Sequence, residues 1–284
     1  MGTALKIHIA RFEPDRVGGG WSFANNFNKA FSGSLSDYES SDIYFITSAS
    51  MVSREEVEQA KRDGKKIVLR IDNIIRNSRN RNTGMTRMRD FAELADYTVF
   101  QSEFSADLLG PYLNPKQWRI IINAVDQSIF HPQGRTETDQ EVYLYSKYSS
   151  DETKNWEMAR LAYQREAHPN STLYLVGRFD GNLEEYNFDF YQGERYRYWG
   201  LITDPHVMAD IYRQSDYFLY SYFNDACSNT VIEALCCGCE IMDVLGMAQT
   251  GGTPEIMRYW QAMGDKFFTL DRLRSQYQEV FNAL

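Results

Sequence analysis

The stretch Asn224-Asp-Ala-Cys-Ser-Asn-Thr-Val-Ile-Glu-Ala-Leu-Cys-Cys-Gly-Cys-Glu-Ile241 carries the clearest structural pattern in this 284-residue chain. It follows an aromatic run at residues 216–221 that is typical of a buried strand. Residues 230–237 form a predicted helix, which Gly238 ends, and an apolar strand pattern resumes at residues 240–245. Strand, loop, helix and strand in this order predict one unit of a parallel α/β sheet.

The loop before this helix is a candidate anion site. Ser228 or Asn229 is suited to cap the helix, whose N-terminus offers unpaired backbone N–H groups and the positive end of a dipole. Both favour phosphate groups. Asp225 lies in the loop and Glu233 lies in the helix eight positions later. Because carboxylates repel phosphate, we expect these two acids to bind sugar or ribose hydroxyls instead.

All four cysteines of the chain lie inside this stretch, within 13 consecutive positions: Cys227, Cys236, Cys237 and Cys239. Such clustering would suit a metal ion, but the rest of the sequence has no Cys or His cluster to complete four ligands. Small, half-buried residues are also what a helix-to-strand turn requires, so a structural role is favoured. Free thiols and the lack of a signal peptide predict a cytoplasmic protein.

Length and composition favour a two-domain globular protein. The chain has 43% hydrophobic and 24% charged residues, which are ordinary globular values. Its net charge of −9 argues against general affinity for nucleic acid or anionic lipid. No apolar run is long enough to span a bilayer, so we expect at most peripheral membrane contact.

The first half of the chain alternates predicted strands with predicted helices. The strand patterns lie at residues 5–10, 42–47, 65–71, 97–101 and 118–122. This alternation predicts a parallel sheet with helices on both faces. Ligands of such sheets collect beyond the carboxyl ends of the strands, so the residues that follow each strand are candidates for a site.

Three such features follow strands in this half. Gly18, Gly19 and Gly20 precede a predicted helix, a geometry that lets the backbone approach phosphate, although a flexible surface loop explains them equally well. Asp72 follows the third strand and is either a site residue or a turn or cap residue. The arginine-rich stretch at residues 76–89 reads first as a solvated loop and second as a site for an anionic acceptor or headgroup.

A polar run at residues 133–140 has the composition of a linker, which places a domain boundary near residue 135. A second alternating series follows it. Lys147 comes after the first strand of this series, and Lys154 opens a helix that we expect to run to about residue 167. The remaining strand patterns lie at residues 171–176, 199–202 and 216–221, and an amphipathic helix covers residues 270–284.

Together these pieces resemble glycosyltransferase family 4, which has the GT-B fold. The acid–seven residues–acid signature of that family is similar to Asp225 and Glu233, and its Glu-Ala-x-x-x-Gly-x-Pro segment is similar to Glu233-Ala-Leu-Cys-Cys-Gly-Cys-Glu240. Further similar segments follow the family's order over nearly the whole chain. They are Asn123-Ala-Val-Asp126, Leu175-Val-Gly-Arg178, Trp199-Gly200, Ile211-Tyr-Arg-Gln-Ser-Asp216 and Gly251-Gly-Thr-Pro-Glu255.

The resemblance implies two Rossmann-like domains whose parallel sheets face each other across a cleft. Residues 1–135 would form the acceptor domain, reduced because the chain is shorter than is usual for this fold. Residues 136–284 would form the nucleotide-sugar domain, and the resemblance allows the last helix to pack back on the N-terminal domain.

The activity implied is transfer of a sugar from a nucleoside diphosphate sugar to a glycan, lipid-linked or small-molecule acceptor, with retention of anomeric configuration. The resemblance implies no metal and no further cofactor. Lys147 and Lys154 would stabilise the leaving diphosphate, Glu233 would bind the ribose and Asp225 the transferred sugar. Asp72 would orient the acceptor or the donor sugar. The other donor-binding residues implied are Gly18, Gly19, Gly20, Arg178, Phe179, Cys227, Ser228, Asn229 and Thr230.

Three positions depart from the family's usual residues. Asp225 stands where Glu is usual, Lys147 replaces an Arg, and Asp72 occupies the place where many members carry a His. These departures support an alternative, a non-catalytic nucleotide-sugar or carbohydrate-binding protein on a decayed transferase scaffold. A nicotinamide-dependent oxidoreductase ranks last because the chain lacks the dinucleotide fingerprint.

Overall fold

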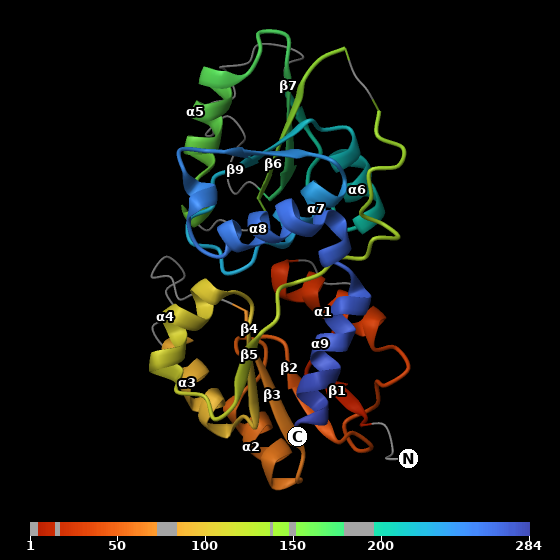
Figure 1. Cartoon of the computed structure of the whole chain (residues 1–284), viewed down its shortest axis with the longest axis vertical. Helices are drawn as coiled ribbons and strands as arrows, with labels where there is room; N and C mark the ends of the chain where they lie inside the picture. Colours follow the sequence, from red (N-terminus) through yellow and green to blue (C-terminus); the bar gives the residue numbers. More distant parts are fainter. Residues whose placement is uncertain (1–4, 15–17, 73–83, 137–138, 148–151, 179–195) are drawn as a thin grey trace. The chain divides into compact units, whose positions relative to one another are not determined.

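The computed structural model describes residues 5–14, 18–72, 84–136, 139–147, 152–178 and 196–284. The chain has an α/β architecture with two five-stranded parallel sheets, as the sequence predicts (Figure 1). It divides into two compact units, which are described one at a time. Unit 1 comprises Met1–Val125, Asp225–Asn229 and Gly251–Leu284, and unit 2 comprises Asp126–Asn224 and Thr230–Thr250.

The sheet of unit 1 has the strand order β1-β2-β3-β4-β5. Three C-terminal elements complete the unit: α8 (Thr253–Met263), η6 (Gly264–Phe267) and α9 (Leu270–Asn282). The elements of its first part are β1 (Ile7–Ile9), α1 (Gly19–Ala30), β2 (Ile43–Ile46), α2 (Arg54–Arg62), β3 (Lys66–Ile71), α3 (Gly84–Leu94), β4 (Tyr97–Phe100), α4 (Glu103–Leu113) and β5 (Trp118–Ile120).

A single extra bridge fixes the topology of this sheet. Leu35, which follows α1, forms a parallel bridge with Ile7 on one edge of β1, while β2 pairs with the other edge of β1. The chain therefore leaves β1 in one direction and returns past it to form β2. This reversal makes the carboxyl ends of β1 and β2 a topological switch point, which is where open α/β sheets bind ligands.

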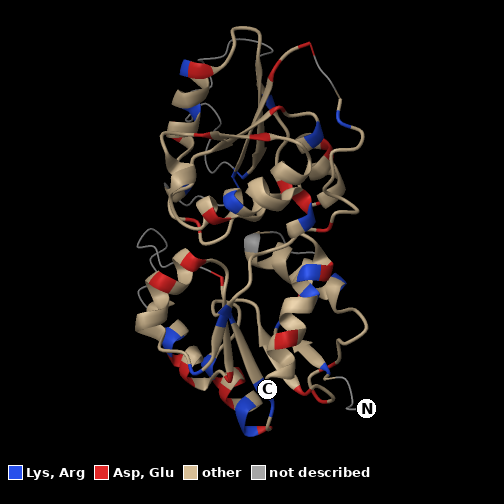
Figure 2. Ribbon diagram, in the orientation of Figure 1, with Lys and Arg blue, Asp and Glu red and all other residues tan. Residues whose placement is uncertain are grey.

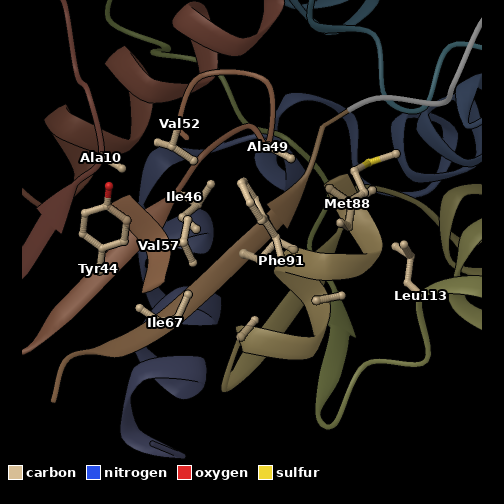
Figure 3. Packing of buried hydrophobic residues seen from close by; sticks show 14 of the residues in the cluster. Ala10, Tyr44, Ile46, Ala49, Val52, Val57, Ile67, Met88, Phe91 and Leu113 are labelled. Carbon is tan, nitrogen blue, oxygen red and sulfur yellow. The ribbon is translucent and has the colours of Figure 1, made fainter. Parts of the chain in front are cut away.

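Alternate residues of β2 enter two different hydrophobic cores, as the twofold repeat of a strand requires. Phe45 faces α1 and α9, where its ring centroid lies 5.4 Å from that of Tyr277. Figure 1 shows α9 beside α1, and Phe27 of α1 contacts Tyr277 with a centroid distance of 5.2 Å. Ile46 faces α2, α3 and α4, and Figure 3 shows it together with Val57 and Phe91. Helices thus cover both faces of the sheet.

The sheet of unit 2 has the strand order β10-β9-β6-β7-β8. The chain moves from β6 outward to β8 and then crosses to β9 on the other side of β6, so the switch point lies between β6 and β9. Its elements are β6 (Val142–Lys147), η2 (Glu152–Lys154), α5 (Trp156–Glu166), β7 (Thr172–Gly177), β8 (Tyr196–Tyr198), α6 (Pro205–Arg213), β9 (Tyr217–Tyr220), α7 (Asn229–Cys236), β10 (Glu240–Asp243) and η5 (Met247–Gln249).

Two predicted elements of this unit are wrong in position. The helix expected to open at Lys154 begins at Trp156, because Asn155 adopts a left-handed conformation with φ of 50° and separates Lys154 from the helix. The strand expected at residues 199–202 is β8, which ends at Tyr198. Gly200, with φ of 70°, turns the chain away from the sheet soon after it.

Acidic and basic residues are interspersed along the helices of both units (Figure 2). Several form surface ion pairs, such as Arg54 with Glu58 at 2.7 Å and Arg258 with Glu103 at 3.0 Å. Exposed pairs of this kind each contribute about 0–1 kcal/mol, so they do not determine the fold. None of the helices in the described residues is both long enough and apolar enough to cross a membrane.

Candidate functional site

Two lysines lie beside the switch point of unit 2. Lys147 is the last residue of β6 and is 6% exposed. The Nζ atom of Lys154 lies 3.7 Å from the centre of the Tyr222 ring, just beyond β9. Tyr222 in turn donates a hydrogen bond from its hydroxyl to the carbonyl oxygen of Ser146, the neighbour of Lys147. Tyr222 thus links the ammonium of Lys154 to the backbone of β6 one residue before Lys147.

Hydrogen bonds to two backbone carbonyl oxygens hold the turn that carries Lys154 in place. The carbonyl oxygen of Lys154 accepts hydrogen bonds from Tyr145 Oη at 3.1 Å and Ser221 Oγ at 2.6 Å. The amide of Phe223 donates to the carbonyl oxygen of Thr153 at 3.1 Å. These bonds tie η2 to the exit of β9, so the side chain of Lys154 is positioned by tertiary contacts.

Arg178 lies next to Lys147 at the same edge of the sheet. Its backbone N–H donates to the carbonyl oxygen of Lys147 at 2.7 Å, and its side chain is exposed. Gly177 makes this approach possible, because a β-carbon there would lie 1.9 Å from the carbonyl oxygen of Lys147. Its φ of 115° is likewise suited to glycine. Phe179, implied as a donor-binding residue, falls outside the described residues.

Glu233 of α7 is buried, and its carboxyl contacts a residue of α6. The hydroxyl of Tyr212, on α6, donates to Glu233 Oε2 at 3.3 Å. Burial raises the pKa of the Glu233 carboxyl to about 8, and the hydrogen bond from Tyr212 offsets this only in part. The carboxyl is therefore largely protonated at neutral pH in this arrangement. Thr230, at the start of α7, is half-buried.

The segment Asp225–Asn229 packs within unit 1. The carbonyl oxygen of Asp225 accepts a hydrogen bond from Gly252 N at 2.8 Å, and Gly252 lies so close that a β-carbon would be 2.0 Å from the carbonyl oxygen of Ala226. Ser228 and Asn229 are buried, and the side chain of Asp225 is half-buried. The Gly251-Gly252 turn thus holds the loop that precedes α7.

All four cysteines are buried free thiols. Burial raises the pKa of Cys227 and of Cys237 to about 12, so these sulfurs are protonated and are poor metal ligands at neutral pH. Cys239 donates to the carbonyl oxygen of Tyr212 at 3.1 Å, which is a packing role. Among the described residues, no group of three or more His, Cys, Asp or Glu side chains could hold a metal ion.

The glycine loop and Asp72 come together at the switch point of unit 1. A β-carbon at Gly20 would lie 3.7 Å from Asp72 Oδ2 and 2.9 Å from the terminal carbon of Met51. The loops after β1, β2 and β3 therefore meet at one edge of the sheet. Gly18 has φ of 120°, and the first turn of α1 begins at Gly19, so its N–H groups face the same edge.

Parts of the remaining predicted features are outside the described residues. Of the arginine-rich stretch, only the residues in α3 are described. Arg87 and Arg89 are exposed there, and the Arg89 guanidinium lies 5.4 Å from the centre of the Tyr112 ring.

Sequence reasoning did not identify Tyr222 or Tyr212 as neighbours of the candidate residues. Tyr222 is one of many aromatic residues, and its position directly after a buried strand was the only available signal. Tyr212 lies on the buried face of α6 and gives no signal of its own, because its contact with Glu233 depends on how two helices pack.

No protein-family model matches the chain, and no curated protein matches its sequence. Solved structures match it in fold. HepE from Anabaena in complex with UDP has a TM-score of 0.73 at 13% identity, over 99% of this chain and 100% of that chain. Sucrose-phosphate synthase from Thermosynechococcus elongatus has a TM-score of 0.69 at 14% identity, over 98% and 99%.

A third match is the catalytic domain of starch synthase IV from Arabidopsis thaliana bound to ADP and acarbose, with a TM-score of 0.59 at 13% identity. It covers 94% of this chain and 78% of that chain. Identities this low show a common fold and nothing finer. These neighbours have the GT-B architecture, and both units described above have the parallel sheets that it requires. The chain therefore has the GT-B fold.

Proposed function

We propose that this chain is a family 4 glycosyltransferase that moves a sugar from a nucleoside diphosphate sugar to a glycan, lipid-linked or small-molecule acceptor, with retention of configuration. One observation carries the proposal. The backbones of Lys147 and Arg178 lie side by side at the switch point of the unit 2 sheet, and Lys154 contacts Tyr222 beyond the neighbouring strand β9, in a chain with the GT-B fold. Three basic side chains at a ligand-binding edge suit an anionic ligand such as a diphosphate.

The chemistry follows from where charge develops. Breaking the anomeric C–O bond leaves negative charge on the diphosphate, and the two lysines would stabilise it without a metal ion. A fixed donor aimed at developing charge is worth about 3–4 kcal/mol of barrier when water is excluded. The Tyr222 ring supports the Lys154 ammonium from one side by a cation–π contact.

The loop after β9 and the helix that follows it would also contact the donor. The N-terminus of α7, preceded by Cys227 and Ser228, offers N–H groups and a positive dipole end to the donor phosphates. Asp225 would accept hydrogen bonds from hydroxyls of the transferred sugar.

In unit 1, the backbone at Gly18, Gly19 and Gly20 would approach a phosphate, and Asp72 would orient the acceptor or the donor sugar. The position of the Asp72 carboxylate beside Gly20 supports a common role for these residues.

Binding of the donor ribose by Glu233 would require the carboxyl to exchange its Tyr212 partner for ribose hydroxyls. This inward arrangement bears on donor binding and not on transfer, so it leaves open the alternative, a non-catalytic nucleotide-sugar or carbohydrate-binding protein on a decayed scaffold. Incubation with a panel of donors and analysis for released or transferred sugar separates the two. Nucleotide binding with neither hydrolysis nor transfer would support the alternative.

Thermal stabilisation by UDP, GDP and ADP tests the donor site directly, because a ligand that binds the native state raises the unfolding temperature. UDP comes first, since the matching HepE structures hold UDP or UDP-glucose. Transfer with the stabilising nucleotide's sugars is then expected to persist in excess EDTA. Absence of stabilisation by every nucleoside diphosphate, or transfer that EDTA abolishes, would contradict the proposal. A cytoplasmic location and at most peripheral membrane contact remain part of the proposal.

A further inference from the structure

Arg70 is a fully buried arginine inside the otherwise apolar strand β3. It is 2% exposed, and its guanidinium lies 3.6 Å from the centre of the Phe23 ring. It donates hydrogen bonds to the carbonyl oxygen of Thr47 at 3.1 Å, to Gln101 Oε1 at 2.6 Å and to Asn123 Oδ1 at 3.0 Å. All of these partners belong to unit 1.

This burial is energetically expensive. Among the described residues no carboxylate forms an ion pair with Arg70, and its Nε atom has no hydrogen-bond partner. Burial lowers the pKa of Arg70 below its ordinary value of 12.5, which reflects the cost of holding the charge there. A leucine or methionine in the same strand would avoid this cost. The side chain therefore needs an explanation beyond packing.

The hydrogen bonds of Arg70 fix the orientation of two carboxamides. Arginine can only donate, so the oxygens of Gln101 and Asn123 must face it. Gln101 Nε2 then donates to the carbonyl oxygen of Ile71 at 2.9 Å. Asn123 Nδ2 donates to Gln101 Oε1 at 2.9 Å, so this oxygen accepts from both Arg70 and Asn123. Without Arg70, the bond to Gln101 Oε1 would be the one of these contacts left to orient the Asn123 amide.

The same Nδ2 of Asn123 also contacts the segment that opens α7. It donates to the carbonyl oxygen of Cys227 at 3.2 Å and to Asn229 Oδ1 at 2.8 Å. Cys227 and Asn229 lie 104 and 106 positions away from Asn123, so no local structure would hold them there. The place of Cys227 and Asn229 thus depends in part on the orientation of the Asn123 amide, and the bond from Gly252 N to the carbonyl oxygen of Asp225 holds the start of the same segment.

We propose that Arg70 is a positioning residue for the donor site, which acts by orienting the Asn123 amide and so fixing the Cys227–Asn229 segment at the N-terminus of α7. The part that concerns the donor rests on the proposed function. The part that concerns the segment stands without it. Arg70 would not touch the donor, since four of its neighbours enclose its guanidinium.

Arg70→Met tests the proposal in the full-length chain, with Arg70→Lys as the conservative variant and Arg119→Met as the control. Arg119 lies on β5 of the same sheet and binds Glu279 at 2.7 Å, outside this network. Without any ligand, amide hydrogen exchange at residues 227–231 should be about tenfold faster in Arg70→Met, the equivalent of one lost hydrogen bond. Exchange in the control should match the wild type.

In the transfer assay, Arg70→Met is expected to raise KM for the donor about tenfold with a smaller change in kcat, and Arg70→Lys should recover part of the loss. Asn123→Ala should raise KM similarly, and combining it with Arg70→Met should add little, because both act through one amide. If Arg70→Met does not fold, Asn123→Ala alone tests the connection to the segment. This variant keeps the Arg70 guanidinium and its hydrogen bonds to Thr47 and Gln101.

A purely structural Arg70 would give a different result. It would lower the melting temperature with exchange at residues 227–231 and donor KM both unchanged, and this outcome overturns the proposal. If the wild type binds no nucleoside diphosphate, the proposed function fails, but the exchange measurement still decides whether Arg70 positions the segment.

Discussion

The ammonium of Lys154 lies against the face of Tyr222, with Nζ 3.7 Å from the ring centre. The backbone of Lys154 and the hydroxyl of Tyr222 are each held by further hydrogen bonds, so both partners are fixed before any ligand arrives. A preorganised cation of this kind loses little entropy when it meets an anion.

Lys154→Ala is expected to lower kcat for sugar transfer by about 100- to 1,000-fold while the protein stays folded. The fold should survive because the carbonyl of Lys154, and not its side chain, accepts the bonds from Tyr145 and Ser221. Steady-state kinetics and circular dichroism measure the two effects. Arg165→Ala, which removes an exposed basic side chain of α5, is the control. Full activity in Lys154→Ala would exclude its role at the diphosphate.

Gly177→Ala should destabilise the protein by more than about 3 kcal/mol, since its methyl group would overlap the carbonyl oxygen of Lys147. Gly134→Ala separates this overlap from backbone strain. Gly134 also has a positive φ, 83°, but a β-carbon there meets nothing within 4 Å, so about 1–2 kcal/mol is expected. Urea unfolding gives both values. Equal losses would mean that strain alone explains Gly177.

The stability of the protein should depend on pH through Glu233. Burial raises the pKa of its carboxyl from 4.5 to about 8, so the folded state binds this proton more tightly than the unfolded chain. The free energy of unfolding should therefore fall as pH rises from about 4.5 to about 8. Glu255, whose pKa burial raises to about 7, acts in the same direction.

Glu233→Gln should flatten this dependence and should be more stable than the wild type at pH 9, where the wild-type carboxyl is ionised. Urea titrations at pH 5, 7 and 9 measure the effect, with the exposed Glu240→Gln as the control. Calorimetry with the nucleotide is the second readout, because the ribose role predicts weaker binding by Glu233→Gln. Unchanged affinity of Glu233→Gln for the nucleotide would refute the ribose role. A free energy of unfolding of the wild type that rises over this pH range would refute the raised pKa of the Glu233 carboxyl.

Tyr277→Phe is expected to leave stability unchanged or to raise it by about 1 kcal/mol. Its hydroxyl is buried without a hydrogen-bond partner, so removing it loses no bond. Tyr145→Phe provides the contrast, because the Tyr145 hydroxyl donates to the carbonyl oxygen of Lys154. That change should cost about 1 kcal/mol. Thermal unfolding of both variants measures the difference, and a clear loss in Tyr277→Phe would reveal a partner for its hydroxyl.

The sequence predicts the sheets well because each strand is a short apolar run bounded by polar or glycine residues. The run at residues 65–71 corresponds to β3, and the helix at residues 230–237 corresponds to α7 within one residue at each end. The α/β class and the two parallel sheets are confirmed. The rudimentary strand at Leu35 could not be foreseen, because a single bridge leaves no repeating pattern.

The candidate site is less predictable from sequence because its side chains depend on distant partners. Lys147 and Lys154 were identified, but the residue that links them is Tyr222, which is 68 or more positions further along the chain. Nothing in the helix pattern around Glu233 indicates that its carboxyl faces Tyr212. The roles assigned to the site residues stay predictions until the experiments above are done.

The packing of α9 against α1 also bears on how the protein forms during synthesis. Tyr277 and Phe281 of α9 contribute to the burial of Phe27 and Phe45. The ribosome makes these two residues of α9 more than 230 residues after Phe45. At about 5–20 residues per second, this aromatic surface stays uncovered for on the order of 10 seconds or more. The strands of the first sheet are made early, but the helical cover of one of its faces is completed only after the strands of unit 2 have been translated, and until then this face is open to chaperones that bind apolar segments.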